Sequence, residues 1–193
     1  MANKIKYGIK NVYYAVATIA DDNTATYGTP VALKGAVSIS MEPQGDNTPF
    51  YADNIVYWVG NGNNGYSGDL EVARITDDFA AEILGEIEDG KGVLVEDANA
   101  AIIHFALMFQ FEGDVKATRH VLYNCTASRT TQAGTTKGES IEPETETVTI
   151  TATSIYDSVL QKDIVKAKTT EDSDQTAYSA WFTAVYTPTA PTP

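Results

Sequence analysis

IIHFALMFQF, residues 102–111, is the stretch of sequence that decides the fold class. The odd positions from Ile103 to Phe111 are all apolar, and most of the even positions are apolar as well. Successive side chains of a strand point to opposite faces of a sheet, so this pattern predicts a strand that is buried on both faces. We expect His104, which lies inside the run, to be a hydrogen-bonded core or interface residue and not a metal ligand.

Strand patterns recur on both sides of this run. Residues 147–153 (TVTITAT) alternate most cleanly, which predicts a strand with one dry and one wet face. The other predicted strands are 12–19, 37–42, 70–75, 120–126 and 177–187. About seven strands in all, lying before and after one helix, favour a mainly antiparallel β-sandwich or barrel over an α/β crossover fold.

One helix is predicted, over residues 77–88. Thr76 or the acids that follow it are suited to cap its N-terminus. Phe79, Ile83 and Ile87 recur every four residues, which is typical of a helix with a single apolar stripe that packs on a sheet. We therefore expect a single β domain over residues 1–187 with one flanking helix, followed by a disordered Pro/Thr tail over 188–193.

The charge balance argues against a protein that grips nucleic acid. Twenty-six Asp and Glu against 13 Lys and Arg give a formal net charge of −13. Proteins that bind a duplex tightly neutralise its phosphates with basic side chains, and this sequence has no basic stripe. An acidic surface would repel DNA.

No catalytic constellation, cofactor motif or metal site is evident, so we do not expect an enzyme. His104 and His120 are the only histidines, and Cys125 is the only cysteine, which excludes an intrachain disulfide. We expect Cys125 to be a buried, inert thiol. The sequence also shows no apolar run suited to a signal peptide or a membrane span, so we expect folding in a cytoplasm and no membrane insertion.

Residues 44–66 combine glycines with an unusual amount of aromatic surface. Two interpretations stay open: the middle of the segment is a strand in the chain's own core, or the segment is a projecting hairpin that a partner covers. The second interpretation makes its aromatic residues candidate inter-subunit contacts, and these are Phe50, Tyr51, Tyr57, Trp58 and Tyr66.

Three acids alternate at Glu142, Glu144 and Glu146. In an extended chain all three would project from one face. They form either a solvated edge whose repulsion prevents strand-to-strand aggregation or part of an acidic surface that faces a channel.

Short pieces of the sequence, in order along nearly the whole chain, resemble the phi13-type major tail proteins of long-tailed bacteriophages. The pieces are Gly8–Ala15, Tyr27–Val31, Phe50–Asn54, Asn63–Gly68, Gly92–Glu96, Lys116–His120, Ile141–Thr147 and Trp181–Thr183. No single piece is a chemical motif, and the resemblance rests on the ordered set.

The resemblance implies a structural virion protein that is assembled in the host cytoplasm. Such a subunit has a β-sandwich or half-barrel with a flanking helix, a long loop that reaches the next ring, and extended terminal arms. Stacked hexameric rings would form the tail tube around a tape-measure protein, between tail initiator and terminator proteins. Double-stranded DNA would later pass through the tube without specific binding. The family implies no catalytic, cofactor or metal residues.

A second function class remains open, a virion or surface β-sandwich module for adhesion or carbohydrate binding. In such a module the exposed aromatic residues would stack on sugars. A monomer with glycan affinity would favour this alternative, whereas rings or filaments would favour the tail tube.

Overall fold

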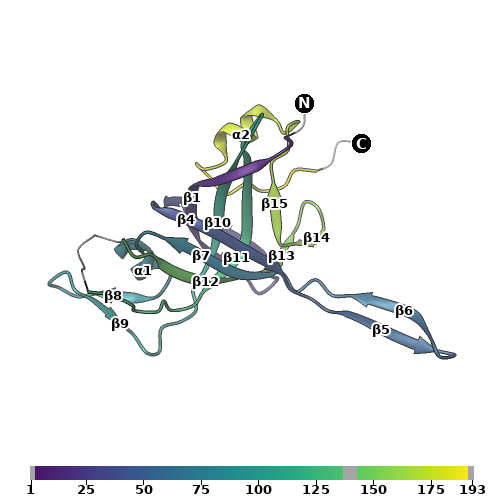
Figure 1. Cartoon of the computed structure of the whole chain (residues 1–193), viewed down its shortest axis with the longest axis horizontal. Helices are drawn as coiled ribbons and strands as arrows, with labels where there is room; N and C mark the ends of the chain where they lie inside the picture. The colour runs from purple at the N-terminus through teal and green to yellow at the C-terminus, as the bar shows by residue number, and fades with distance from the viewer. Residues whose placement is uncertain (1–2, 137–142, 191–193) are drawn as a thin grey trace.

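The computed structural model of the chain describes residues 3–136 and 143–190 (Figure 1). Its main feature is a nine-stranded antiparallel sheet, accompanied by three two-stranded sheets and two short helices. The mainly β, antiparallel class predicted from the sequence is confirmed. The prediction of one flanking helix was wrong, because a second short helix lies near the C-terminal end.

The elements have the following bounds. The strands of the large sheet are β1 (Lys6–Ile19), β2 (Ala25–Tyr27), β3 (Val31–Ala32), β4 (Ala36–Pro43), β7 (Tyr66–Val72), β10 (His104–Gly113), β11 (Thr118–Ala127), β12 (Glu146–Thr153) and β15 (Lys166–Lys168). The small sheets pair β5 (Asn47–Ala52) with β6 (Ile55–Asn61), β8 (Glu86–Glu88) with β9 (Leu94–Glu96), and β13 (Ile155–Asp157) with β14 (Lys162–Ile164). The helices are α1 (Asp77–Glu82) and α2 (Gln175–Ala180).

The large sheet follows the order β2-β1-β10-β11-β12-β7-β4, with β3 pairing to β1 and β15 pairing to β11. Strands from both ends of this order contribute to one hydrophobic core together with α1, so the sheet curves around that core. Among the described residues β4 is hydrogen-bonded to β7 and to no other strand of the large sheet, and no closed barrel is found.

The central strand β10 is buried on both faces, as predicted. Phe105 and Leu107 point into the core that α1 covers. Ala106 and Met108, on the opposite face, pack in a second core beneath the C-terminal segment that contains Trp181. The alternation predicted for residues 147–153 is also confirmed, since the apolar positions of β12 are fully buried and its threonines are exposed.

Helix α1 is shorter than predicted. Thr76 does cap it, because its hydroxyl accepts a hydrogen bond of 3.3 Å from the backbone N–H of Phe79. The helix ends at Glu82, and Gly85 then takes a φ of +77°, which L-residues rarely adopt and which turns the chain into β8. Ile87 therefore belongs to a strand and is exposed, so the predicted helical stripe stops at Ile83.

The strand predicted over residues 177–187 was wrong. Asp174 accepts hydrogen bonds from the backbone N–H groups of Thr176 and Ala177, and this cap starts α2. Trp181 and Val185, four residues apart, are buried on one side of the turns that follow the helix. The apolar spacing of this segment is thus helical, and its aromatic and β-branched composition favoured the wrong element.

Candidate interaction surface

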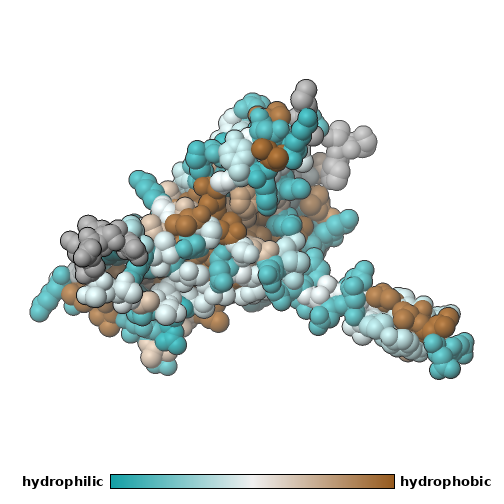
Figure 2. All heavy atoms as spheres, in the orientation of Figure 1, coloured by the Kyte–Doolittle hydropathy of each residue, from teal (hydrophilic) through white to brown (hydrophobic). Residues whose placement is uncertain are grey.

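Residues 44–65 form an arm that projects from the large sheet (Figure 1). Within residues 3–136 and 143–190, its strands β5 and β6 pair with each other and with no third strand. In the space-filling view the arm stands clear of the rest of the chain and carries apolar side chains along its length (Figure 2). Of the two interpretations left open for this segment, the structure has the projecting hairpin.

The arm continues the two outermost strands of the sheet. β4 leads into β5, β6 leads into β7, and two backbone hydrogen bonds of 2.9 Å hold the root together: Gln44 N–H to the Gly65 carbonyl and Asn64 N–H to the Gln44 carbonyl. Gly65 has a φ of +90°, and a Cβ at this position would lie 1.9 Å from the carbonyl oxygen of Ala152. Only glycine therefore allows the arm to leave the sheet so close to β12.

The tip of the arm is a tight two-residue turn. Asp53 and Asn54 connect β5 to β6 with φ values of 51° and 61°. Two consecutive positive φ values are the mark of a type I′ turn, and Asp and Asn tolerate them better than most residues. The local sequence thus specifies a hairpin without help from the rest of the chain.

Large apolar side chains of the arm are exposed on both of its faces. Phe50 is 58% exposed, Tyr51 63%, Tyr57 71% and Trp58 61%. Pairing across the hairpin places Phe50 beside Trp58 and Tyr51 beside Val56. A two-stranded ribbon has no interior of its own and is at best marginally stable in water, so these side chains have contacts to gain from a partner.

Tyr66, the fifth predicted contact residue, lies apart from the other four. It is the first residue of β7 and is half-buried against the main core. The ammonium group of Lys166 lies 4.2 Å from the centre of its ring. Tyr66 therefore belongs to the body of the subunit, and sequence reasoning grouped it with the arm because only Gly65 separates the two.

The three alternating acids are only partly covered by the structure. Glu142 lies outside the described residues. Glu144 accepts hydrogen bonds from the backbone N–H and the hydroxyl of Thr135, and Glu146 accepts one of 2.5 Å from the backbone N–H of Ile75. Both described acids thus bind neighbouring backbone, and the acidic channel surface stays a prediction.

A second exposed apolar patch was missed by sequence reasoning. It comprises Ile87 of β8, its cross-strand partner Val95 of β9, and Val93 just before β9. The patch lies in Figure 1 at the end of the molecule opposite the arm. The alternating Val93 and Val95, flanked by Gly92 and by acidic residues, did indicate a short strand. A run of only three residues, 93–95, is too short to show which face of the strand is buried.

His104 and Cys125, which the sequence predicted to be structural residues, contact only nearby parts of the fold in the described chain. His104 lies 2.6 Å from the side-chain oxygen of Asn124, so it is hydrogen-bonded as predicted. Cys125 is completely buried, and burial raises the pKa of its thiol to about 12. Within residues 3–136 and 143–190, no group of three or more His, Cys, Asp or Glu side chains could hold a metal ion. Neither described helix is long and apolar enough to cross a membrane.

Neither a scan against protein-family models nor a search of curated proteins found a match to this chain.

Proposed function

We propose that this chain is a structural subunit that assembles with copies of itself into the tail tube of a long-tailed bacteriophage. The observation that carries the proposal is the arm, an apolar hairpin that the lone subunit leaves uncovered on both faces. The resemblance of ordered sequence pieces to phage major tail proteins names the kind of assembly. The half-barrel tail-tube fold, the hexameric rings and the virion location are parts of this proposal.

The size of the exposed surface supports self-assembly. A large aromatic side chain buries on the order of 150–250 Å², so the roughly three fifths left exposed on each of the four arm aromatics amounts to about 400–600 Å² in total. A standard specific interface buries about 800 Å² per partner. The arm aromatics alone would thus supply roughly half to three quarters of one partner's share of an interface.

The acidic balance supports a conduit that does not hold its cargo. With a net charge of −13, the tube would offer few phosphate contacts to passing DNA. The proposed partners are further copies of the chain, the tape-measure protein during assembly, and initiator and terminator proteins at the ends. We expect no gel shift of duplex DNA at micromolar protein and physiological salt, and a shift that weakens steeply with added salt would contradict this part.

Negative-stain electron microscopy of the purified protein, alone at high concentration and with a tail initiator, tests the proposal. We expect rings or tubes. A protein that stays monomeric under both conditions and is not incorporated into tails in a complementation assay would overturn it. A glycan array on the same sample separates the alternative, since the exposed aromatics of a carbohydrate-binding module would bind sugars as a monomer.

A further inference from the structure

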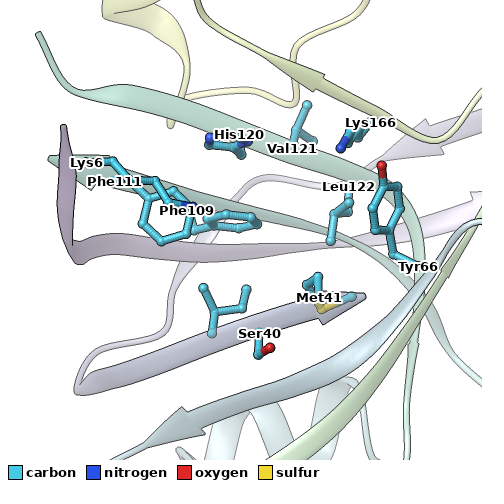
Figure 3. Close-up of a pocket in the computed structure, with 11 residues that line it drawn as sticks. Lys6, Ser40, Met41, Tyr66, Phe109, Phe111, His120, Val121, Leu122 and Lys166 are labelled. Atoms are coloured by element: carbon cyan, nitrogen blue, oxygen red, sulfur yellow. The ribbon is translucent and has the colours of Figure 1, made fainter. Parts of the chain in front are cut away.

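A groove opens in the body of the subunit where β11 changes partners. The first half of β11 pairs with β15, at His120 to Leu122, whereas the second half pairs with β12, from Asn124 onward. The β12-β7-β4 part of the sheet therefore diverges from β10 and β11. The wedge between β4 and the β10–β11 pair is a cavity of about 330 Å³ that is open to the surface (Figure 3).

Aromatic and aliphatic side chains line this groove together with Lys6, Lys166 and Ser40. Phe109 of β10 and His120 of β11 are cross-strand partners whose rings stack in parallel, with centroids 5.1 Å apart. Met41 of β4 and Leu122 of β11 line the same space (Figure 3). Burial, and then the nearby Lys168 and Lys166, lower the pKa of His120 to about 4. The imidazole is therefore neutral at physiological pH and acts as part of an uncharged aromatic surface.

Two cations stand at the groove. The ammonium group of Lys6 lies 4.4 Å from the centre of the Phe111 ring, and that of Lys166 lies 4.2 Å from the centre of the Tyr66 ring. Neither lysine makes an ion pair with a described residue, and the groove is lined by no Asp or Glu of the described chain. The molecule has twice as many acidic as basic residues. At this groove, however, the two lysines would attract an acidic, apolar ligand, and no lining carboxylate would repel it.

The arm has the complementary composition. No Lys or Arg occurs between Lys34 and Arg74, and the arm itself carries Asp46 and the tip residue Asp53. Its aromatic side chains match the apolar walls of the groove. The chain's own arm points away from its own sheet (Figure 1), so the groove is free to receive the arm of another copy.

We propose that this groove is the docking site for the arm of a second copy of the chain. The inference rests on the proposed function and adds the receiving surface to it. The contact is heterologous, because each copy offers an arm on one side and a groove on another. Such contacts leave an unused arm and an unused groove in every dimer, and they continue until the assembly closes into a ring or grows as a helical stack.

Charge decides between the groove and the second apolar patch as the receiving surface. The patch around Val93 and Val95 is bordered by Glu86, Glu88 and Glu96, of which Glu96 is paired with Arg129. Glu86 and Glu88 have the same sign as the acids of the arm, and like charges brought together across an interface are unfavourable. The groove offers opposite charge beside its aromatic and aliphatic side chains.

Cysteine cross-linking between two variants of the full-length chain tests the proposal. One variant carries Ala52→Cys near the arm tip, and the other carries Met41→Cys, whose side chain lines the groove. The control is Ser128→Cys, an exposed serine just beyond the end of β11 that is far from His120. The native Cys125 does not compete, because it is buried and its thiol pKa is raised. Circular dichroism establishes that each variant is folded.

After mild oxidation we expect the Ala52→Cys and Met41→Cys pair to yield at least about tenfold more cross-linked dimer on a non-reducing gel than the control pair of Ala52→Cys and Ser128→Cys. Adding Lys6→Glu and Lys166→Glu to the groove variant should reduce this yield about tenfold. The same charge change at Lys34 and Lys91 should leave the yield unaltered. Equal yields for Met41→Cys and Ser128→Cys would overturn the docking site.

The outcome also separates this inference from the proposed function. Rings or tubes without the specific cross-link would mean that the copies assemble through another surface, and the groove proposal alone would fail. The specific cross-link, together with no rings or tubes and no incorporation into tails in the complementation assay, would leave the groove proposal standing and overturn the tail-tube proposal. Absence of the cross-link, of rings or tubes and of incorporation would overturn both.

Discussion

Strands β10 and β6 have similar apolar content but opposite surroundings. From Phe105 to Phe109, every side chain of β10 is buried, because sheet neighbours flank the strand and a core lies on each face. From Ile55 to Val59, every side chain of β6 is exposed, because β5 is the one strand that pairs with it in the described part of the chain. Apolar residues in a strand therefore indicate a surface that becomes buried, and the residues that bury it can belong to the same chain or to another one.

The largest expected effect is on the β10 side of this comparison. Phe105→Ala removes a fully buried ring that packs edge-on against Phe79 of α1. We expect a loss of about 3–5 kcal/mol in the free energy of unfolding, because the cavity adds to the lost transfer free energy. Denaturant unfolding followed by circular dichroism measures it, and a loss below about 1 kcal/mol would show that β10 is not the centre of the core.

Trp58→Ala in the arm should have the opposite effect, a loss of assembly without a loss of fold stability. We expect the melting temperature to stay nearly unchanged and tubes to become short or absent, at a cost of about 2 kcal/mol or more per contact if Trp58 is an interface anchor. Trp181→Ala is the matched control: this indole is only 3% exposed and donates a hydrogen bond to the carbonyl of His120, so its loss should lower the melting temperature. A large fall in melting temperature for Trp58→Ala would place that residue in the subunit's own core.

His120 of β11 lies in the wall of the groove. Its protonation should make the stability of the folded subunit depend on pH. Its folded pKa of about 4 is below the usual value of 6.5, so the unfolded chain binds a proton first as the pH falls. This contribution to stability is fully present above pH 6.5 and is lost as the pH falls from 6.5 to 4, by about 2 kcal/mol after allowance for partial exposure.

Comparison with His120→Phe isolates this effect from the titration of the carboxylates. The variant keeps an aromatic ring beside Phe109 and removes the titratable group. We expect its stability to fall less steeply between pH 6.5 and 4 than that of the unaltered chain. Parallel curves for the two proteins would mean that His120 is not held in its neutral form.

The smallest expected effect concerns α1, which covers the core that β10 shares. Thr76→Ala removes the side-chain acceptor for the Phe79 N–H and should cost about 1 kcal/mol of stability, as helix caps typically do. Assembly should be unaffected, since the arm does not contact this helix. Thr76→Ser, which retains the hydroxyl, should recover most of the loss in the same unfolding experiment.

The sequence predicted a strand correctly where the pattern of side chains was compatible with only one kind of structure. Val148, Ile150 and Ala152 alternate with threonines, and only a half-buried strand fits that pattern. The prediction for the C-terminal segment was wrong because its aromatic and β-branched residues suggested a strand. The four-residue separation of Trp181 and Val185 and the cap at Asp174 instead specify helical turns.

The candidate interaction surface was predictable in composition but not in geometry. The glycines and aromatics of residues 44–66 marked the arm, yet nothing local could say that β5 and β6 would find no third strand. The groove was beyond sequence reasoning altogether. It depends on β11 dividing its hydrogen bonds between β15 and β12, which brings Lys6, Met41 and His120 together from distant parts of the chain.

The clamped root of the arm has a mechanical consequence. The seven residues of β6, at about 3.3 Å per residue, make a ribbon of roughly 23 Å. Residues 62–65, which lie in no strand, connect this ribbon to β7, and the two backbone hydrogen bonds at Gln44 tie its root. A small change in the angle of the chain at this root is therefore amplified into a much larger displacement of Asp53 at the tip. Subunits joined through such levers would share strain along their whole length, and a distortion imposed at one end of the assembly would be felt at the other.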